Sequence, residues 1–191
     1  MTRAHIRQQI RHARRQLSAA QQHLGAQQIV KQVASSARLA QAKKVALYLA
    51  NDGELDPQPL IDWYWQQGAQ VYLPVLHPFC KGYLLFFRYQ AGTPLITNRL
   101  GIAEPQLDIR QLLPLQQLDV IYTPLVAFDN LGNRMGMGGG FYDRTLAGRK
   151  QGPRPLTVGL AHDCQQLAFV PTESWDIPLV ELITPSQHWR W

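Results

Sequence analysis

The chain has 191 residues and a formal net charge of +6, and it is 46% hydrophobic and 17% charged. A chain of this length fits one domain with a sizeable core, so we expect a single domain spanning residues 1–191. The longest apolar runs are residues 45–50 and 118–128, and both have the length of strands. We therefore expect no membrane-spanning helix.

The cysteine content and the N-terminus indicate the compartment. Cys80 and Cys164 are the only cysteines, too few for a disulfide framework, and we expect both thiols to be buried. The N-terminal stretch lacks the apolar centre of a secretory signal. We therefore expect a cytoplasmic protein.

The basic excess belongs to the N-terminal part of the chain. Residues 1–51 hold nine Lys or Arg and no acidic residue, whereas the remainder holds ten basic and thirteen acidic residues. Arg3, Arg7, Arg11 and Arg15 recur every four residues, which on a helix makes one cationic stripe. The stripe has three interpretations: a solvated helix face, an arginine-rich transit peptide, or a face that binds the phosphates of a nucleotide, another polyanion or RNA.

In chain order, the apolar pattern predicts two helices in the first forty residues, with Ser18 as the cap of the second. A further helix is expected to start at Pro57 and another at Phe141, and residues 98–105 are rich in turn formers. The expected strands are residues 45–49, 70–75, 84–89, 118–128, 156–160 and 180–183.

This alternation of apolar strands and helices predicts an α/β fold, with three layers and a mainly parallel sheet flanked by helices. The expected arrangement is Rossmann-like but without the dinucleotide fingerprint. In such sheets, ligands bind beyond the carboxyl ends of the strands. Three segments occupy these ends: residues 51–54, the glycine-rich residues 132–140, and the pair His162-Asp163.

The segment from Gly132 to Arg144 is the strongest candidate for a site, since five of its thirteen residues are glycine. Glycine lets a ligand approach bare backbone N–H groups, which can cradle phosphate. The spacing fits neither the dinucleotide fingerprint nor a Walker A loop. The alternative is a tight turn between a strand and a helix that has no functional role. The flanking polar residues Asn133, Arg134 and Asp143 favour a functional site instead.

These residues resemble the signature of the 5-formyltetrahydrofolate cyclo-ligases, also called methenyltetrahydrofolate synthetases. The resemblance covers essentially the whole chain. It implies an enzyme that closes the formyl group of 5-formyltetrahydrofolate onto N10, with ATP becoming ADP and phosphate and Mg²⁺ required. Its matching segments are Arg3 with Arg7, Leu49-x4-Glu54, the run from Asp129 to Arg144, the run from Gly159 to Gln165, and Trp175-Asp176-Ile177-Pro178-Leu179.

The resemblance also implies residue roles. Arg134 and Asp143 would be catalytic, Asp143 would hold Mg²⁺, and Asp163 is the second metal candidate. Leu49, Glu54 and Tyr142 would bind the folate, with Glu54 accepting hydrogen bonds from the pterin amino group and ring N–H. The residues expected to bind ATP are Arg3, Arg7, Asn133, Arg134, Met135, Gly136, Met137, Gly138, Gly139, Gly140 and Phe141.

The expected partners are 5-formyltetrahydrofolate and ATP, with no nucleic acid and no membrane, and the expected state is a monomer. Two other functions stay open at this point. One is an RNA- or nucleotide-binding protein that uses the arginine stripe. The other is a phosphotransferase that uses the glycine-rich segment on a substrate other than folate. Taken alone, Asp143 could equally be a first-turn helix acid, and Glu54 an exposed turn acid.

Overall fold

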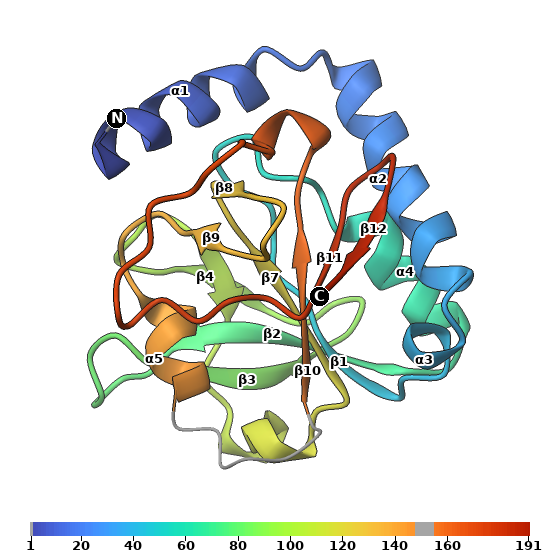
Figure 1. Cartoon of the computed structure of the whole chain (residues 1–191). Coiled ribbons are helices and arrows are strands. Elements are labelled where there is room, and N and C mark those ends of the chain that lie inside the picture. Colours follow the sequence, from blue (N-terminus) through green and yellow to red (C-terminus); the bar gives the residue numbers. More distant parts are fainter. Residues whose placement is uncertain (1, 148–154) are drawn as a thin grey trace.

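The computed structural model describes residues 2–147 and 155–191. Its main sheet has eight strands: β1 (Lys44–Ala46), β2 (Gln70–Leu76), β3 (Leu84–Tyr89), β6 (Leu112–Leu113), β7 (Val120–Pro124), β10 (Leu156–Leu160), β11 (Glu181–Ile183) and β12 (His188–Arg190). They lie in the order β12-β11-β10-β7-β1-β2-β3-β6 (Figure 1). The five strands from β11 to β2 pair in parallel, and antiparallel pairing occurs only toward the two edges. The predicted mainly parallel α/β sheet is confirmed.

The helices are α1 (Arg3–Arg15), α2 (Ala19–Ala34), α3 (Ala37–Ala40), α4 (Gln58–Gln66) and α5 (Phe141–Ala147). The predicted cap is confirmed, because Ser18 and Gln21 form a reciprocal capping box at the start of α2. Short 3₁₀ turns lie at Ile109–Gln111, Leu115–Gln117 and Asp163–Gln165. None of the described helices is long and apolar enough to cross a bilayer.

Two small hairpins complete the fold. The turn-rich region contains β4 (Leu95–Thr97) paired with β5 (Ala103–Pro105), and the chain after β7 forms β8 (Ala127–Phe128) paired with β9 (Arg134–Met135). The strand expected over residues 118–128 is therefore split in two. Gln165 separates its halves, since the Nε2 group of this side chain donates to the carbonyls of Leu125 and Val126.

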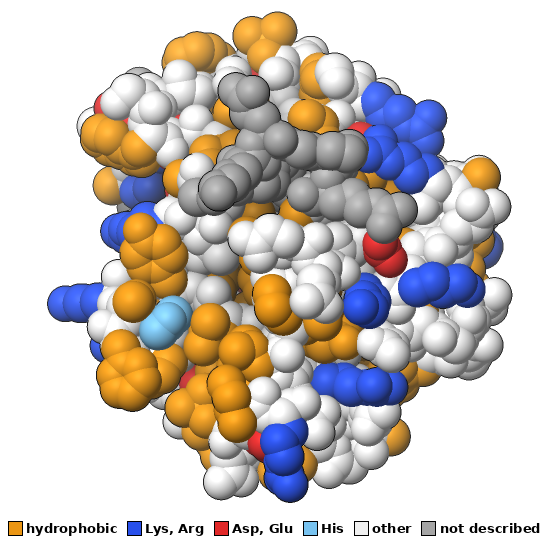
Figure 2. All heavy atoms as spheres, turned by 90° about the horizontal axis from the view of Figure 1, so that it is seen from below, with side chains coloured by type: hydrophobic (Ala, Val, Ile, Leu, Met, Phe, Trp, Pro, Cys, Tyr) orange, Lys and Arg blue, Asp and Glu red, His pale blue; other side chains and the backbone are white. Residues whose placement is uncertain are grey.

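Basic side chains are not confined to α1. On the face seen from below, Lys and Arg side chains are more prominent than Asp and Glu, and hydrophobic side chains gather on one side (Figure 2).

Cys80 is exposed in the loop between β2 and β3, and Cys164 is half-buried. The prediction that both thiols are buried is therefore wrong for Cys80, because a surface connection carries it.

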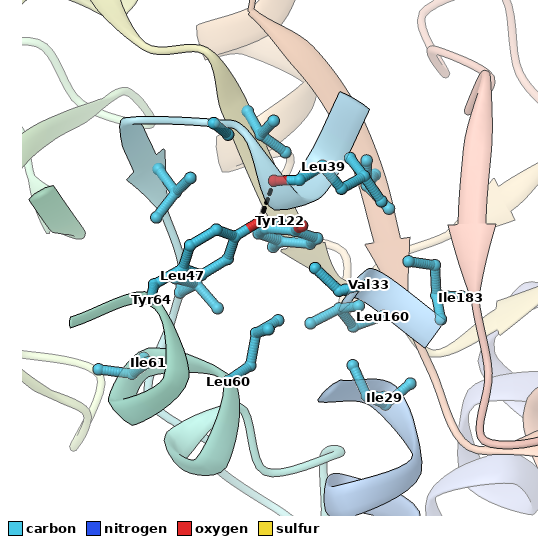
Figure 3. Close-up of a cluster of buried hydrophobic side chains, with 14 of the residues drawn as sticks. Ile29, Val33, Leu39, Leu47, Leu60, Ile61, Tyr64, Tyr122, Leu160 and Ile183 are labelled. Atoms are coloured by element: carbon cyan, nitrogen blue, oxygen red, sulfur yellow. Dashed lines mark hydrogen bonds between the residues drawn. The ribbon is translucent and has the colours of Figure 1, made fainter. Parts of the chain in front are cut away.

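The two faces of the sheet pack against different elements. Val45 and Leu47 lie in one core cluster with residues of α2 and α4, such as Ile29 and Leu60 (Figure 3). Ala46, between them in the chain, packs on the opposite face in a cluster that includes Leu146 of α5. This alternation is the period of two that a strand imposes on its side chains. Helices thus cover both faces, as predicted.

The surroundings of Gly132 leave no room for a side chain. Its φ is +81°, and a Cβ there would lie 2.8 Å from the carbonyl oxygen of Leu179 and 3.0 Å from the ring of Trp191. The Leu179 N–H also donates to the Gly132 carbonyl at 2.9 Å. Glycine at this position therefore lets the glycine-rich segment pack directly against the chain before β11.

We expect Gly132→Ala to lower the free energy of unfolding by about 3 kcal/mol, because it combines backbone strain with a steric clash. Denaturant unfolding followed by circular dichroism measures the change. Gly68→Ala is a matched control: its φ is +71° but no atom lies within 4 Å of the added Cβ. It should cost about 1 kcal/mol. Equal losses in the two variants would show that the approach to Leu179 does not matter.

Candidate active site

A cavity of about 640 Å³ lies at the carboxyl ends of β1, β2 and β7. Four segments of the chain enclose it: the loop after β1, the β4–β5 hairpin, the glycine-rich segment and the start of α5. Leu49 and Glu54 line one side, and Gly140, Tyr142 and Asp143 line another. The structure therefore brings together two of the three segments that the strand order predicted.

The loop after β1 is held by arginines of α1. The carboxylate of Asp52 accepts hydrogen bonds from Arg11, Arg14 and Arg15, and the backbone of Asp52 has a φ of +55°. Arg14 is fully buried, and its Nε donates to the Asp52 carbonyl at 2.8 Å. These contacts fix the backbone that leads into Glu54.

Glu54 lies in this loop with its carboxylate in the cavity wall. Its Oε2 accepts a hydrogen bond from the Asn51 N–H at 3.1 Å. Burial raises the pKa of Glu54, and the Asn51 N–H and the charge of Arg14 offset only part of that rise. A carboxylate placed in this way gains stability from ligand N–H donors that replace the water it has lost.

The same helix also reaches the glycine-rich segment. Arg7 Nε donates to the Gly136 carbonyl at 2.9 Å, and the Arg7 guanidinium would lie 3.6 Å from a Cβ on Gly138. Ile6 and Ile10 pack in a core cluster with Met135 of β9. The α1 helix therefore joins the two walls of the cavity, and its arginines mostly bind groups of this chain.

The backbone of the glycine-rich segment presents free donors. Within the described part of the chain, the N–H groups of residues 136–141 donate no hydrogen bond. Gly138 and Gly140 have φ values of +100° and +64°, which fold the segment into a tight curve. Arg144 steadies it by donating to the Gly139 carbonyl at 2.6 Å. Consecutive free N–H groups beside arginines form a concave anion site.

Arg134 and Asp143 form an ion pair in the cavity wall. Arg134 is 4% exposed; its Nη2 lies 2.5 Å from Asp143 Oδ1, and its Nε donates to the Ile177 carbonyl at 3.2 Å. Arg3 pairs in a similar way with Asp176, at 2.5 Å. The charges of both aspartates act on both arginines. Asp176 does not line the cavity, but its charge acts on Arg134, which does; the sequence marked Asp176 only as part of the motif at residues 175–179.

An apolar wall completes the cavity. Leu49, Leu73 and Leu125 line it, together with the aromatic side chains of Tyr48 and Tyr142. Burial raises the pKa of Tyr142 far above its ordinary value, so this phenol stays protonated at neutral pH. Tyr48 donates its hydroxyl hydrogen to the Leu55 carbonyl at 2.9 Å. Flat apolar ligand rings would find stacking surface here.

Six predicted site residues do not line the cavity: Arg3, Arg7, Asn133, Met135, Gly138 and Asp163. The Asn133 amide donates to Asp129 Oδ2 at 3.0 Å, and Met135 is fully buried among the residues that hold α1. Asp163 accepts a hydrogen bond from the Ser186 hydroxyl at 2.6 Å and does not line the cavity. Among residues 2–147 and 155–191, no group of three or more His, Cys, Asp or Glu is placed to hold a metal ion.

Comparison with known proteins agrees with this geometry. A sequence model of the 5-formyltetrahydrofolate cyclo-ligase family matches residues 1–185. The chain belongs to this family. It is 52% identical over 182 residues to the 5-formyltetrahydrofolate cyclo-ligase of Escherichia coli K12, covering 95% of this chain and all of that protein.

Two further relatives support the family assignment. The 5-formyltetrahydrofolate cyclo-ligase of Haemophilus influenzae is 50% identical over 181 residues, covering 95% of this chain and 96% of that protein. The NMR structure of the Aquifex aeolicus 5,10-methenyltetrahydrofolate synthetase superposes with a TM-score of 0.83 at 29% identity, covering all of this chain and 93% of that one. The predicted resemblance to the cyclo-ligase family is thereby confirmed.

Proposed function

We propose that this member of the cyclo-ligase family converts 5-formyltetrahydrofolate into 5,10-methenyltetrahydrofolate with ATP, releasing ADP and phosphate. The observation that carries the proposal is the run of free N–H groups at residues 136–141, because all of these residues except Gly138 line the same cavity as Glu54. The arrangement offers one subsite for a polyphosphate and, next to it, one for a flat ring with N–H donors.

The chemistry explains why both subsites share one cavity. The formyl carbonyl is a poor electrophile, and ring closure must expel its oxygen. Transfer of the γ-phosphoryl group to that oxygen creates a leaving group, after which N10 of the same molecule attacks the formyl carbon. The protein's task is to align the two substrates and to neutralise phosphate charge.

On the ATP side, we assign the phosphates to the backbone of Gly136, Met137, Gly138, Gly139 and Gly140, with Phe141 at the start of α5. Arg134 binds the transferred phosphoryl group with Nη1, while its Nε and Nη2 hold the guanidinium on the Ile177 carbonyl and Asp143. Arg7 approaches from α1, with Arg3 beside it. Asn133 and Met135 support this segment through Asp129 and the core packing of α1.

Mg²⁺ fits the carboxylates at this end of the cavity, since it prefers one or two carboxylates together with phosphates and waters. Asp143, which lines the cavity, is the residue that would hold it. Asp176, whose charge acts on Arg134, is the second candidate, in preference to Asp163, which accepts a hydrogen bond from Ser186. When bound, the ion would neutralise charge on the phosphates. Asp143 and Asp176 have arginine partners that keep these carboxylates in place.

On the folate side, Glu54 accepts hydrogen bonds from the pterin amino group and ring N–H, and Leu49 and Tyr142 pack against the rings. The remaining parts of the proposal are a single domain over residues 1–191, a monomer in the cytoplasm, and no nucleic-acid or membrane partner.

Glu54→Gln tests the folate subsite. We expect KM for 5-formyltetrahydrofolate to rise about 10- to 100-fold, because hydrogen bonds to a charged acceptor are lost. The affinity for ATP should stay unchanged. Steady-state kinetics with each substrate varied, and ATP titration without folate, measure the two effects. Asp62→Asn is the control, because it also removes one negative charge, but from an exposed residue on α4.

The raised pKa of Glu54 also predicts how the Glu54→Gln substitution changes stability. The pKa of Glu54 is higher in the folded state than in the unfolded chain, so ionising this group opposes folding, and its stabilising contribution is lost as pH rises through the folded pKa. Glu54→Gln should therefore melt at no lower temperature than the parent at pH 7. A weaker ATP affinity or a clearly lower melting temperature would contradict the assignment of Glu54 to folate alone.

A further inference from the structure

A second glutamate of the cavity has no role in the account above. Glu104, on β5, is 8% exposed and lines the cavity from the β4–β5 hairpin. Its Oε2 accepts hydrogen bonds from the Leu76 N–H at 3.0 Å and from the Asn98 amide at 2.8 Å. Both donors are neutral. Within the described chain Glu104 forms no ion pair, and its Oε1 accepts no hydrogen bond.

This arrangement leaves uncompensated negative charge in the cavity. The described lining contains two basic residues, Arg11 and Arg134, and four acidic residues. Each arginine is paired with an aspartate, Arg11 with Asp52 and Arg134 with Asp143. Of the other two acids, Glu54 lies under the charge of Arg14 behind the loop, whereas Glu104 has no ion-pair partner in the described chain and contributes an unbalanced negative charge. A buried carboxylate without a cation is costly unless a ligand completes it.

The reaction supplies a cation, and this step rests on the proposed function. When the formyl oxygen bonds to the γ-phosphorus, the bond from that phosphorus to ADP breaks and the N5–carbon bond becomes an iminium. N10 then bonds to this carbon, the carbon–oxygen bond breaks, and phosphate leaves with the N10 proton. The uncharged ring system of the folate thus becomes an amidinium whose positive charge is shared by N5 and N10.

We propose that Glu104 supplies the negative charge that stabilises this cation as it forms. A fixed charge in a cavity with a mostly apolar lining acts strongly on charge that develops in the reaction. The substrate carries no positive charge on its ring system, so Glu104 favours the iminium and the amidinium over the ground state. Its two neutral hydrogen-bond donors hold the carboxylate in place without cancelling its charge.

Glu104→Gln removes the negative charge of this side chain but can keep its hydrogen bonds. The amide oxygen of glutamine can still accept from the Leu76 N–H and the Asn98 amide, so the hairpin stays tied to β2. We expect kcat to fall about 10- to 100-fold while KM for 5-formyltetrahydrofolate changes little. The affinity for 5,10-methenyltetrahydrofolate, a cation, should fall by a similar factor, and that for neutral tetrahydrofolate should not change. Titration of each folate without ATP measures both.

Two further variants fix the interpretation. Asp108→Asn removes one negative charge from the exposed Asp108–Arg110 pair outside this cavity, and it should leave both folate affinities unchanged. Asn98→Ala removes the hydrogen bond to Glu104 and those that Asn98 Oδ1 accepts from the Leu100 and Ile102 N–H groups, but it keeps the charge of Glu104. It should therefore preserve the ratio of the affinities for the methenyl and the unsubstituted folate. The ratio of the two folate affinities can be measured in Asn98→Ala even if Glu104→Gln is poorly folded.

The outcomes are distinct. Selective loss of the cationic ligand in Glu104→Gln alone supports the proposal. Equal weakening of both folates, an unchanged kcat, or the same shift in ratio in Asn98→Ala overturns it and makes Glu104 a structural residue. If the unaltered protein forms no methenyl product from 5-formyltetrahydrofolate and ATP, the proposed function itself fails, whatever the variants do.

Discussion

Asp52→Asn will destabilise the protein by about 3–5 kcal/mol, since it removes one partner of a buried ion pair. Arg14 is fully buried, and Arg11 and Arg15 share the same carboxylate. Without that carboxylate, the Arg14 guanidinium stays desolvated and unpaired. Asparagine keeps the size of the side chain and tolerates the positive φ of this position, so the loss reports on charge. Denaturant unfolding measures it.

Asp62→Asn is the control for this change. Asp62 is exposed on α4 and accepts a hydrogen bond only from the Gln58 amide among the described residues, so its loss should stay within about 0.5 kcal/mol. Combining Asp52→Asn with Arg14→Met should recover part of the stability, because it removes the unpaired buried charge. A loss in Asp52→Asn no larger than in Asp62→Asn would show that the arginines do not depend on this carboxylate.

Arg134→Lys will reduce kcat/KM for ATP by about 100- to 1,000-fold, the effect expected when a group that stabilises transition-state charge is lost. Lysine keeps the positive charge but loses the planar fork, which here binds the Ile177 carbonyl with Nε and Asp143 with Nη2. Binding of 5-formyltetrahydrofolate without ATP should persist. Initial rates of methenyl product formation at varied ATP measure the change.

Arg38→Lys is the matched control, because Arg38 pairs with Glu181 on the protein surface and does not line the cavity. Its kcat/KM should equal that of the parent. Melting temperatures of both variants show whether the Arg134 change acts through unfolding. If a folded Arg134→Lys variant keeps the parent kcat/KM for ATP, the assignment of this guanidinium to phosphoryl transfer is wrong.

Much of the fold follows from local patterns in the sequence. The strand at residues 84–89 was predicted with its observed bounds, and the cap at Ser18 was read correctly, because both depend on neighbouring residues. The first strand was expected to reach residue 49 but ends at Ala46, since the chain turns away toward the cavity. β12 was not expected, because its antiparallel pairing depends on β11 rather than on its own pattern.

Sequence also located the two walls of the candidate site. Glu54 and the glycine-rich segment meet because parallel strands deliver both to the same edge of the sheet. Their roles came from the family signature rather than from periodicity or spacing. For Asp163, the position after a strand suggested a metal site, whereas the structure places this side chain against Ser186. Its assignment to the metal stays a prediction that the geometry does not favour.

The sequence predicted no role for three acidic residues in or beside the site. Asp52 holds three arginines, Asp176 pairs with Arg3, and Glu104 faces the cavity from a hairpin. Their partners lie far away in the chain, so no local pattern marks them. The arginine stripe was visible, but its contacts with Asp52 needed the tertiary structure. These contacts tie the C-terminal half of α1 to the loop after β1, whereas Arg3 and Arg7 in its first half remain assigned to the ATP phosphates.

The most direct test mixes the purified protein with 5-formyltetrahydrofolate, Mg²⁺ and ATP and follows the near-ultraviolet absorbance of the methenyl product. We expect product to form in equal amount with ADP, and none without ATP. Product formation without ATP would contradict phosphorylation of the formyl oxygen. No product from a folded protein that binds ATP would contradict the proposed function and point to another phosphoryl acceptor.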